Sequence, residues 1–90
     1  MILTTHQVSD FDRWWGIFST TGAEKRTEHG SKGSHVFRDP NDEARVWVVF
    51  DWDEAGFQEF LADPDVPAIF KEAGIQGPPQ MAEGAGEHGA

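Results

Sequence analysis

Cysteine and tyrosine are both absent from this chain. Without cysteine, no disulfide can supplement the core, and no thiolate can act as a nucleophile or a metal ligand. The 90 residues form one domain at most, and a chain of this length buries only ~60–65% of the surface that its unfolded form exposes. Stability must therefore depend on apolar burial, to which association with a second copy of the chain would add.

Basic residues are also scarce, because 16 Asp and Glu stand against 7 Lys and Arg and give a net charge of −9. Nucleic acids and anionic membrane surfaces attract basic proteins, so neither is an expected partner. No apolar run reaches the ~18 residues of a membrane-spanning helix, and residues 1–8 lack the basic start and long apolar stretch of a signal peptide. We therefore expect a cytoplasmic protein.

Phenylalanine and tryptophan, by contrast, are abundant, with seven and four copies. Each of these side chains can bury ~150–250 Å². Together they exceed what a small core needs, so we expect some of them to line a pocket or a subunit interface. The alternative is that all of them pack in the core.

Hydrophobic periodicity predicts the secondary structure. Residues 2–8 and 45–52 are rich in β-branched and aromatic side chains, as strands are. The aromatic residues from Phe11 to Phe18 recur at the spacing of one helical face. In chain order we expect a strand over 2–8, a helix over 10–28, strands over 33–39 and 45–52, helices over 53–63 and 65–74, a linker over 75–79 and a brief strand over 79–82. Residues 1–82 then form the domain, and residues 83–90 a flexible C-terminal tail.

This order is β-α-β-β-α-β, which predicts a ferredoxin-like α+β fold: a four-stranded antiparallel sheet with helices on one face. The other face of the sheet is then left open. Either Trp47 and its neighbours or the row from Val46 to Trp52 lies there. Because a large exposed apolar face is normally buried, we expect a second copy to stack sheet to sheet and form a homodimer.

Three segments carry a family resemblance. They are the pattern H-x-V-x-D-F-x-x-W over 6–14 with Phe18 four residues on, the run FDWD over 50–53 followed by FLADP over 60–64, and AGI and GPP within 73–79. The chain resembles the dimeric α-β barrel superfamily over residues 4–80, in the branch of small cyclases and antibiotic-biosynthesis-monooxygenase-like proteins. The resemblance implies a homodimer whose two sheets form a barrel, with a cavity between helices and sheet in each subunit.

Members of this superfamily include cofactor-free monooxygenases, polyketide cyclases, haem-degrading enzymes and lactone isomerases, so the resemblance does not define one reaction. The haem-degrading members depend on a set of Asn, His and Trp residues. The only asparagine here is Asn41, in the predicted hairpin turn, so that set is not carried over. We therefore expect no cofactor.

His6 and His35 are the first candidates for catalysis. Both lie on predicted strands, and imidazole is suited to proton transfer near neutral pH. If they share a cavity, one can act as a base and the other can orient it; the alternative is that each is a hydrogen-bonded structural histidine. Asp51 is a third candidate, because burial within its apolar strand would raise its pKa. Its alternatives are an ion pair with a nearby arginine or capping of the next helix.

The aromatic side chains can form a wall that binds a flat, apolar substrate such as a polyketide or a polycyclic phenol. Oxygen chemistry without a cofactor needs a substrate that becomes an electron-rich anion, so the protein supplies only a base and a dry pocket. No ligand pair at metal-binding spacing is present, so we expect no metal site. The candidate wall consists of Trp14, Trp15, Phe18, Trp47, Trp52, Phe57 and Phe70, with packing in the core or the dimer interface as the alternative for each.

Three functions remain open from the sequence. The first is a small enzyme of cyclase or cofactor-free monooxygenase type acting on a flat aromatic molecule. The second is a non-catalytic binder of apolar small molecules, and the third is an accessory dimer that recruits another protein. A buried cavity reached by His6 or His35 would favour the first, a purely apolar cavity the second, and a solid core the third.

Overall fold

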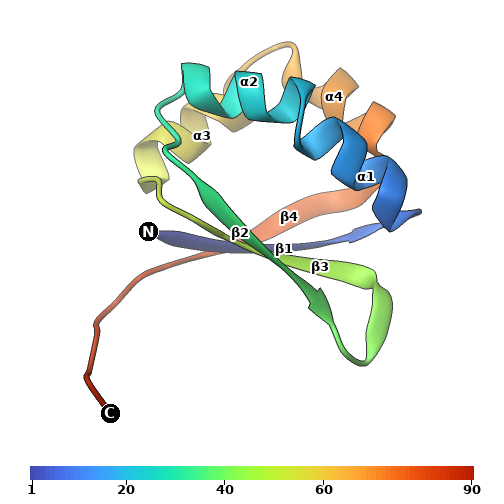
Figure 1. Ribbon diagram of the computed structural model, residues 1–90. Coiled ribbons are helices and arrows are strands. Elements are labelled where there is room, and N and C mark those ends of the chain that lie inside the picture. Colours follow the sequence, from blue (N-terminus) through green and yellow to red (C-terminus); the bar gives the residue numbers. More distant parts are fainter.

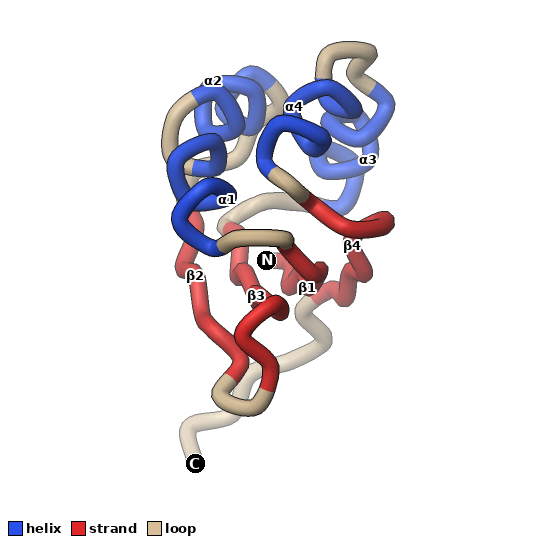
Figure 2. Tube along the Cα trace, turned by 90° about the vertical axis from the view of Figure 1, so that its right-hand side faces the viewer, coloured by secondary structure: helices blue, strands red, loops and turns tan.

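The computed structural model describes residues 1–90. Four helices cover one face of a four-stranded sheet (Figures 1 and 2), which confirms the ferredoxin-like α+β fold. None of the helices is long and apolar enough to cross a membrane. The elements are β1 (Ile2–Val8), α1 (Phe11–Phe18), α2 (Thr21–Glu28), β2 (Ser34–Asp39), β3 (Asp42–Phe50), α3 (Glu54–Ala62), α4 (Val66–Ala73) and β4 (Ile75–Glu83).

The sheet is antiparallel throughout, with the strand order β2-β3-β1-β4. Alternation along the two central strands decides which side chains face the helices. Val46, Val48 and Phe50 of β3 are buried, whereas Trp47 and Val49 point to the open face and are only half-buried. The row that contains Trp47 is therefore the one left without helices.

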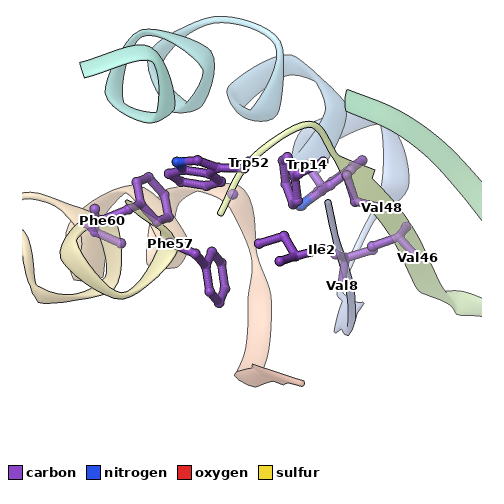
Figure 3. Close-up of a cluster of buried hydrophobic side chains, with 11 residues drawn as sticks. Ile2, Val8, Trp14, Val46, Val48, Trp52, Phe57 and Phe60 are labelled. Carbon is purple, nitrogen blue, oxygen red and sulfur yellow. The ribbon is translucent and has the colours of Figure 1, made fainter. Parts of the chain in front are cut away.

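The core lies between the helices and the sheet. Trp14 and Phe60 enter it from the helices, and Ile2 and Val48 from the strands (Figure 3). The buried apolar residues are Ile2, Val8, Trp14, Val46, Val48, Phe50, Trp52, Phe57, Phe60, Val66 and Ala73.

The predicted single helix over 10–28 is wrong, because it is broken between α1 and α2 at Ser19 and Thr20. Ser19 Oγ donates to the carbonyl of Trp15 at 2.7 Å, and Thr20 Oγ1 to that of Gly16 at 2.6 Å. Such side-chain bonds compete with the helical backbone pattern. The backbone of Thr20, with φ −121° and ψ −96°, leaves the helical region. The chain therefore turns before α2 begins.

The predicted final strand over 79–82 is present but longer than expected, and the predicted linker over 75–79 is wrong, since β4 starts at Ile75. Ile75 pairs with Val8, and the register then shifts where Gly77 has a φ of +78°. An edge strand tolerates this irregularity and the prolines that follow it, because one side of its backbone needs no sheet partner. Residues 84–90 contain no helix or strand and extend away from the sheet (Figure 1); their flexibility stays a prediction.

Candidate functional site

A small cavity of about 50 Å³ lies between the helical layer and the sheet. Its floor comes from β1 and β3, and its walls come from all four helices and from β4. Most of its lining is aromatic or aliphatic, and two titratable side chains reach it, His6 and Arg26. The lining residues are Thr4, His6, Trp14, Phe18, Arg26, Phe50, Trp52, Phe57, Phe60, Phe70, Ile75 and Pro79.

His6 stands on the helix-facing side of β1 and is only 8% exposed. Its ring centroid lies 5.6 Å from that of Trp14. Both ring nitrogens are buried, and neither has a hydrogen-bond partner in the protein. Buried polar atoms are almost always hydrogen-bonded. The imidazole therefore does not fit the alternative of a hydrogen-bonded structural histidine, and its nitrogens are free to bind a molecule in the cavity.

Burial, and to a smaller extent the positive charge of Arg45, lower the pKa of His6 to about 4. The imidazole is thus neutral at neutral pH and has one nitrogen that accepts a hydrogen bond or a proton. With a pKa of about 4, the imidazole is a weak base at neutral pH, so it takes a proton from an O–H or C–H of a bound molecule only where the pocket also stabilises the resulting anion.

Arg26 brings a positive charge into the same cavity. Its side chain is 9% exposed, and its guanidinium carbon lies 3.7 Å from the ring centroid of Phe18 and 5.6 Å from that of Phe50. Its Nη2 donates to the carbonyl of Phe18 at 2.9 Å. Burial lowers the pKa of Arg26 to about 10, so the group stays charged at neutral pH.

The sequence reasoning missed Arg26, because on one continuous helix it falls in a solvated last turn. A usable signal was Gly22, one helical turn earlier. A Cβ atom at Gly22 would lie 3.0 Å from Arg26 Nη1, so the absence of a side chain there makes room for the guanidinium.

The structure brings some of the predicted residues together and separates others. Five of the seven aromatic candidates line the cavity beside His6. Trp15 is 46% exposed on α1 and does not line it. Trp47 lies on the open sheet face, where its Nε1 donates to Asp39 Oδ2 at 3.1 Å. The five are Trp14, Phe18, Trp52, Phe57 and Phe70.

His6 and His35 do not share a cavity, so the condition for their acting as a pair is not met. β3 separates their strands, and His35 pairs with Val49, so it points to the open face whereas His6 points to the helices. The expected burial of Asp51 is also not found, because Asp51 follows β3 and is exposed. Neither residue contributes to the cavity around His6.

No family model and no curated protein matches this sequence. Several solved structures do match its fold. SnoaB, a cofactor-independent oxygenase from Streptomyces nogalater, is 14% identical with a TM-score of 0.72, over 99% of this chain and 95% of that one. An antibiotic biosynthesis monooxygenase is 16% identical with a TM-score of 0.62, over 96% of this chain and 97% of that one. The chain shares its ferredoxin-like fold with these structures. At these identities the likeness defines the fold and not the activity.

The open face of the sheet carries several apolar side chains. Phe37 is 55% exposed and Leu3 36% exposed, and both lie beside the half-buried Trp47 and Val49 in the strand register. A groove of about 210 Å³ runs along this face between Trp47 and β4. The helices leave all of these groups uncovered.

One cluster of polar side chains lies outside the cavity. Glu28, His29 and Asp63 place possible ligand atoms within 4.8 Å of one another. The ammonium group of Lys25 already contacts Asp63 at 3.2 Å and Glu28 at 3.0 Å. His29 Nε2 lies 2.9 Å from the same Asp63 oxygen. We interpret this cluster as an ion-pair network that connects α2 to the segment after α3.

Proposed function

We propose that this chain is a homodimeric enzyme of cyclase or cofactor-free monooxygenase type that acts on a flat aromatic or polyketide-type small molecule. The observation that carries the proposal is His6, a buried and neutral imidazole without a protein partner that faces an aromatic cavity. SnoaB, a cofactor-independent oxygenase with the same fold, supports it.

In the proposed reaction, His6 is the base. It takes a proton from an acidic position of the substrate, and the substrate becomes an electron-rich anion. Such an anion can react with dioxygen without a cofactor or attack a carbonyl group of its own chain and close a ring. The surrounding aromatic side chains exclude water and orient the flat ring system.

The cavity disfavours the two alternative functions. A purely apolar lining would suit a passive binder of apolar molecules, but His6 and Arg26 place an acceptor and a cation in it. A solid core would suit an accessory protein, but the core contains this space. At about 50 Å³ it is smaller than the ~300–1,000 Å³ of small-molecule sites. Entry of a ring system therefore requires the aromatic side chains to move apart.

The test is oxygen uptake in the presence of anthrone, a flat tricyclic ketone with an acidic methylene group. We expect the wild-type chain to accelerate uptake and His6→Ala to lose the acceleration while it keeps the oligomeric state. His35→Ala, a histidine on the opposite face of the same sheet, is the matched control and should keep it. Equal acceleration by wild type and His6→Ala would remove His6 as the base.

We further propose that the open sheet face is the homodimer interface. Burial of Phe37, Leu3 and Trp47 against a second copy would remove the exposed apolar surface of this face. Phe37→Asp and Trp47→Asp should each shift the chain towards the monomer in sedimentation velocity. Trp15→Asp, at an exposed tryptophan on the helical side, is the control. An unchanged dimer in both sheet-face variants would place the interface elsewhere.

A further inference from the structure

The guanidinium of Arg26 is a buried charge without a counter-ion. The ion pairs of the structure are made by Lys25, His29 and Arg45, and none of them includes Arg26. Acidic residues are not lacking, since the chain has 16. A largely buried charge without an ionic partner is costly even though, as here, its unbonded nitrogens keep some contact with solvent, so its presence beside a cavity needs an explanation.

The structural role of Arg26 accounts for only part of its hydrogen-bonding capacity. A guanidinium has five N–H donors, and the single bond that Arg26 makes is from Nη2 to the carbonyl of Phe18. Stacking on the Phe18 ring, at 3.7 Å, fixes the plane of the group without using its other donors. The remaining N–H groups have no acceptor in the protein, although the side chain lines the cavity.

The cavity therefore combines three chemical features. Aromatic rings from Trp14, Phe18 and Phe70 provide flat walls, Arg26 provides a cation with free donors, and His6 provides a neutral acceptor. A carboxylate that is ionised at neutral pH could accept from Arg26 and from the imidazole N–H, but it has no proton for the acceptor nitrogen of His6. A phenol or an enol satisfies both groups, because its O–H proton can go to His6 and its oxygen can then pair with Arg26.

We propose that this cavity binds a planar aromatic compound through one ionised phenol or enol oxygen, with Arg26 as the partner of the oxyanion. This rests on the proposed function and names its substrate class. In the step concerned, the O–H bond of the ligand breaks, its proton forms an N–H bond on His6, and the electron pair stays on the oxygen beside Arg26. Nothing is oxidised or reduced, and the total charge of the site is unchanged.

The experiment uses 4-nitrophenol, a single-ring probe whose phenolate absorbs visible light and whose phenol does not. Binding to wild-type protein is measured by absorbance from pH 5 to pH 9, and 4-nitrotoluene serves as the uncharged analogue of similar shape. We expect the bound probe to ionise at a lower pH than the free probe. We also expect the phenolate to bind at least about tenfold more tightly than 4-nitrotoluene, as one charge-assisted hydrogen bond would give.

Two variants connect the effect to Arg26. Arg26→Met keeps an apolar side chain that can pack on Phe18, and it should lose both the tenfold preference and the shifted ionisation. Gly22→Ala introduces a methyl group 3.0 Å from Nη1, and it should weaken the preference without removing the charge. If either variant fails to fold, the titration of the probe bound to wild-type protein still tests whether the cavity favours the phenolate.

The outcomes separate the two proposals. If 4-nitrotoluene binds as tightly as the phenolate and the bound probe ionises normally, the inference about the oxyanion is overturned while the aromatic pocket stands. If the preference survives in Arg26→Met, Arg26 is not the partner and the inference is again overturned. If neither compound binds, the inference is overturned together with the site on which the proposed function depends.

Discussion

Acidification should destabilise this fold through His6. An imidazole in the unfolded chain titrates near its ordinary pKa of 6.5, whereas burial lowers the pKa of His6 to about 4 in the folded chain. Between these values the unfolded state binds a proton that the folded state does not, so stability falls as the pH falls through this window. At ~1.4 kcal/mol per pKa unit, the loss between pH 7 and pH 4 approaches about 3 kcal/mol for the folded pKa of about 4.

The assay is urea unfolding followed by tryptophan fluorescence at pH 7, 6, 5 and 4, at one fixed protein concentration because an associating chain gains stability with concentration. His6→Phe keeps a ring in the site but has no group that titrates, so its stability should lack this component of the pH dependence. His35→Gln, which removes an exposed histidine of the same sheet, should behave like the wild type.

Other groups do not confuse this comparison. A hydrogen bond with Glu83 raises the pKa of Glu54, so protonation of Glu54 opposes the fall in stability on acidification. Because Glu54 is present in every variant, its effect cancels when the stability of wild type is compared with that of His6→Phe. The hydrogen bond from His29 lowers the pKa of Asp63 to about 2, so its contribution is lost only below the window. If wild type and His6→Phe show parallel pH profiles between 7 and 4, His6 exchanges protons freely and the buried site described above is wrong.

Two matched pairs test the packing, with chemical denaturation as the measurement. Gly56→Ala should lower the free energy of unfolding by about 1–3 kcal/mol, because its Cβ would lie 2.4 Å from Trp52 Nε1. Gly16→Ala, with nothing within 4 Å, should instead raise it by roughly 0.5–1 kcal/mol. Trp14→Ala, at a side chain 1% exposed, should cost about 3–5 kcal/mol, whereas Trp15→Ala, at 46% exposed, should cost far less. Similar effects within either pair would contradict the assigned burial.

Much of the fold was predictable because each strand and helix follows from a local pattern. Strict alternation along β3 predicted that Val46 and Trp47 lie on opposite faces, and the structure adds which face the helices cover. The helical geometry that follows from the aromatic spacing places the adjacent Trp14 and Trp15 ~100° apart. In the structure one is buried and the other is half exposed.

The sequence predictions failed where the local pattern was weak, or where pairing with a distant segment determines the structure. The start of β4 was missed because Gly77 and two prolines are typical of a linker, and only pairing with β1 makes that segment a strand. The pairing of His6 with His35 depended on strand order, which no local pattern contains. β3 pairs with both β1 and β2 and so keeps the two histidine strands apart.

Arg26 was the least predictable part of the site. The break between α1 and α2 explains both its position and why most of its N–H donors have no acceptor in the protein. On one continuous helix Arg26 would lie ~12 Å further along the axis than Phe18, too far to stack on that ring. The break after α1 brings α2 back, and Arg26 Nη2 then supplies the donor that the next helical turn would have given to the Phe18 carbonyl. One helix end thus fixes the guanidinium through a single donor. The donors that remain are free to hold an oxyanion beside His6.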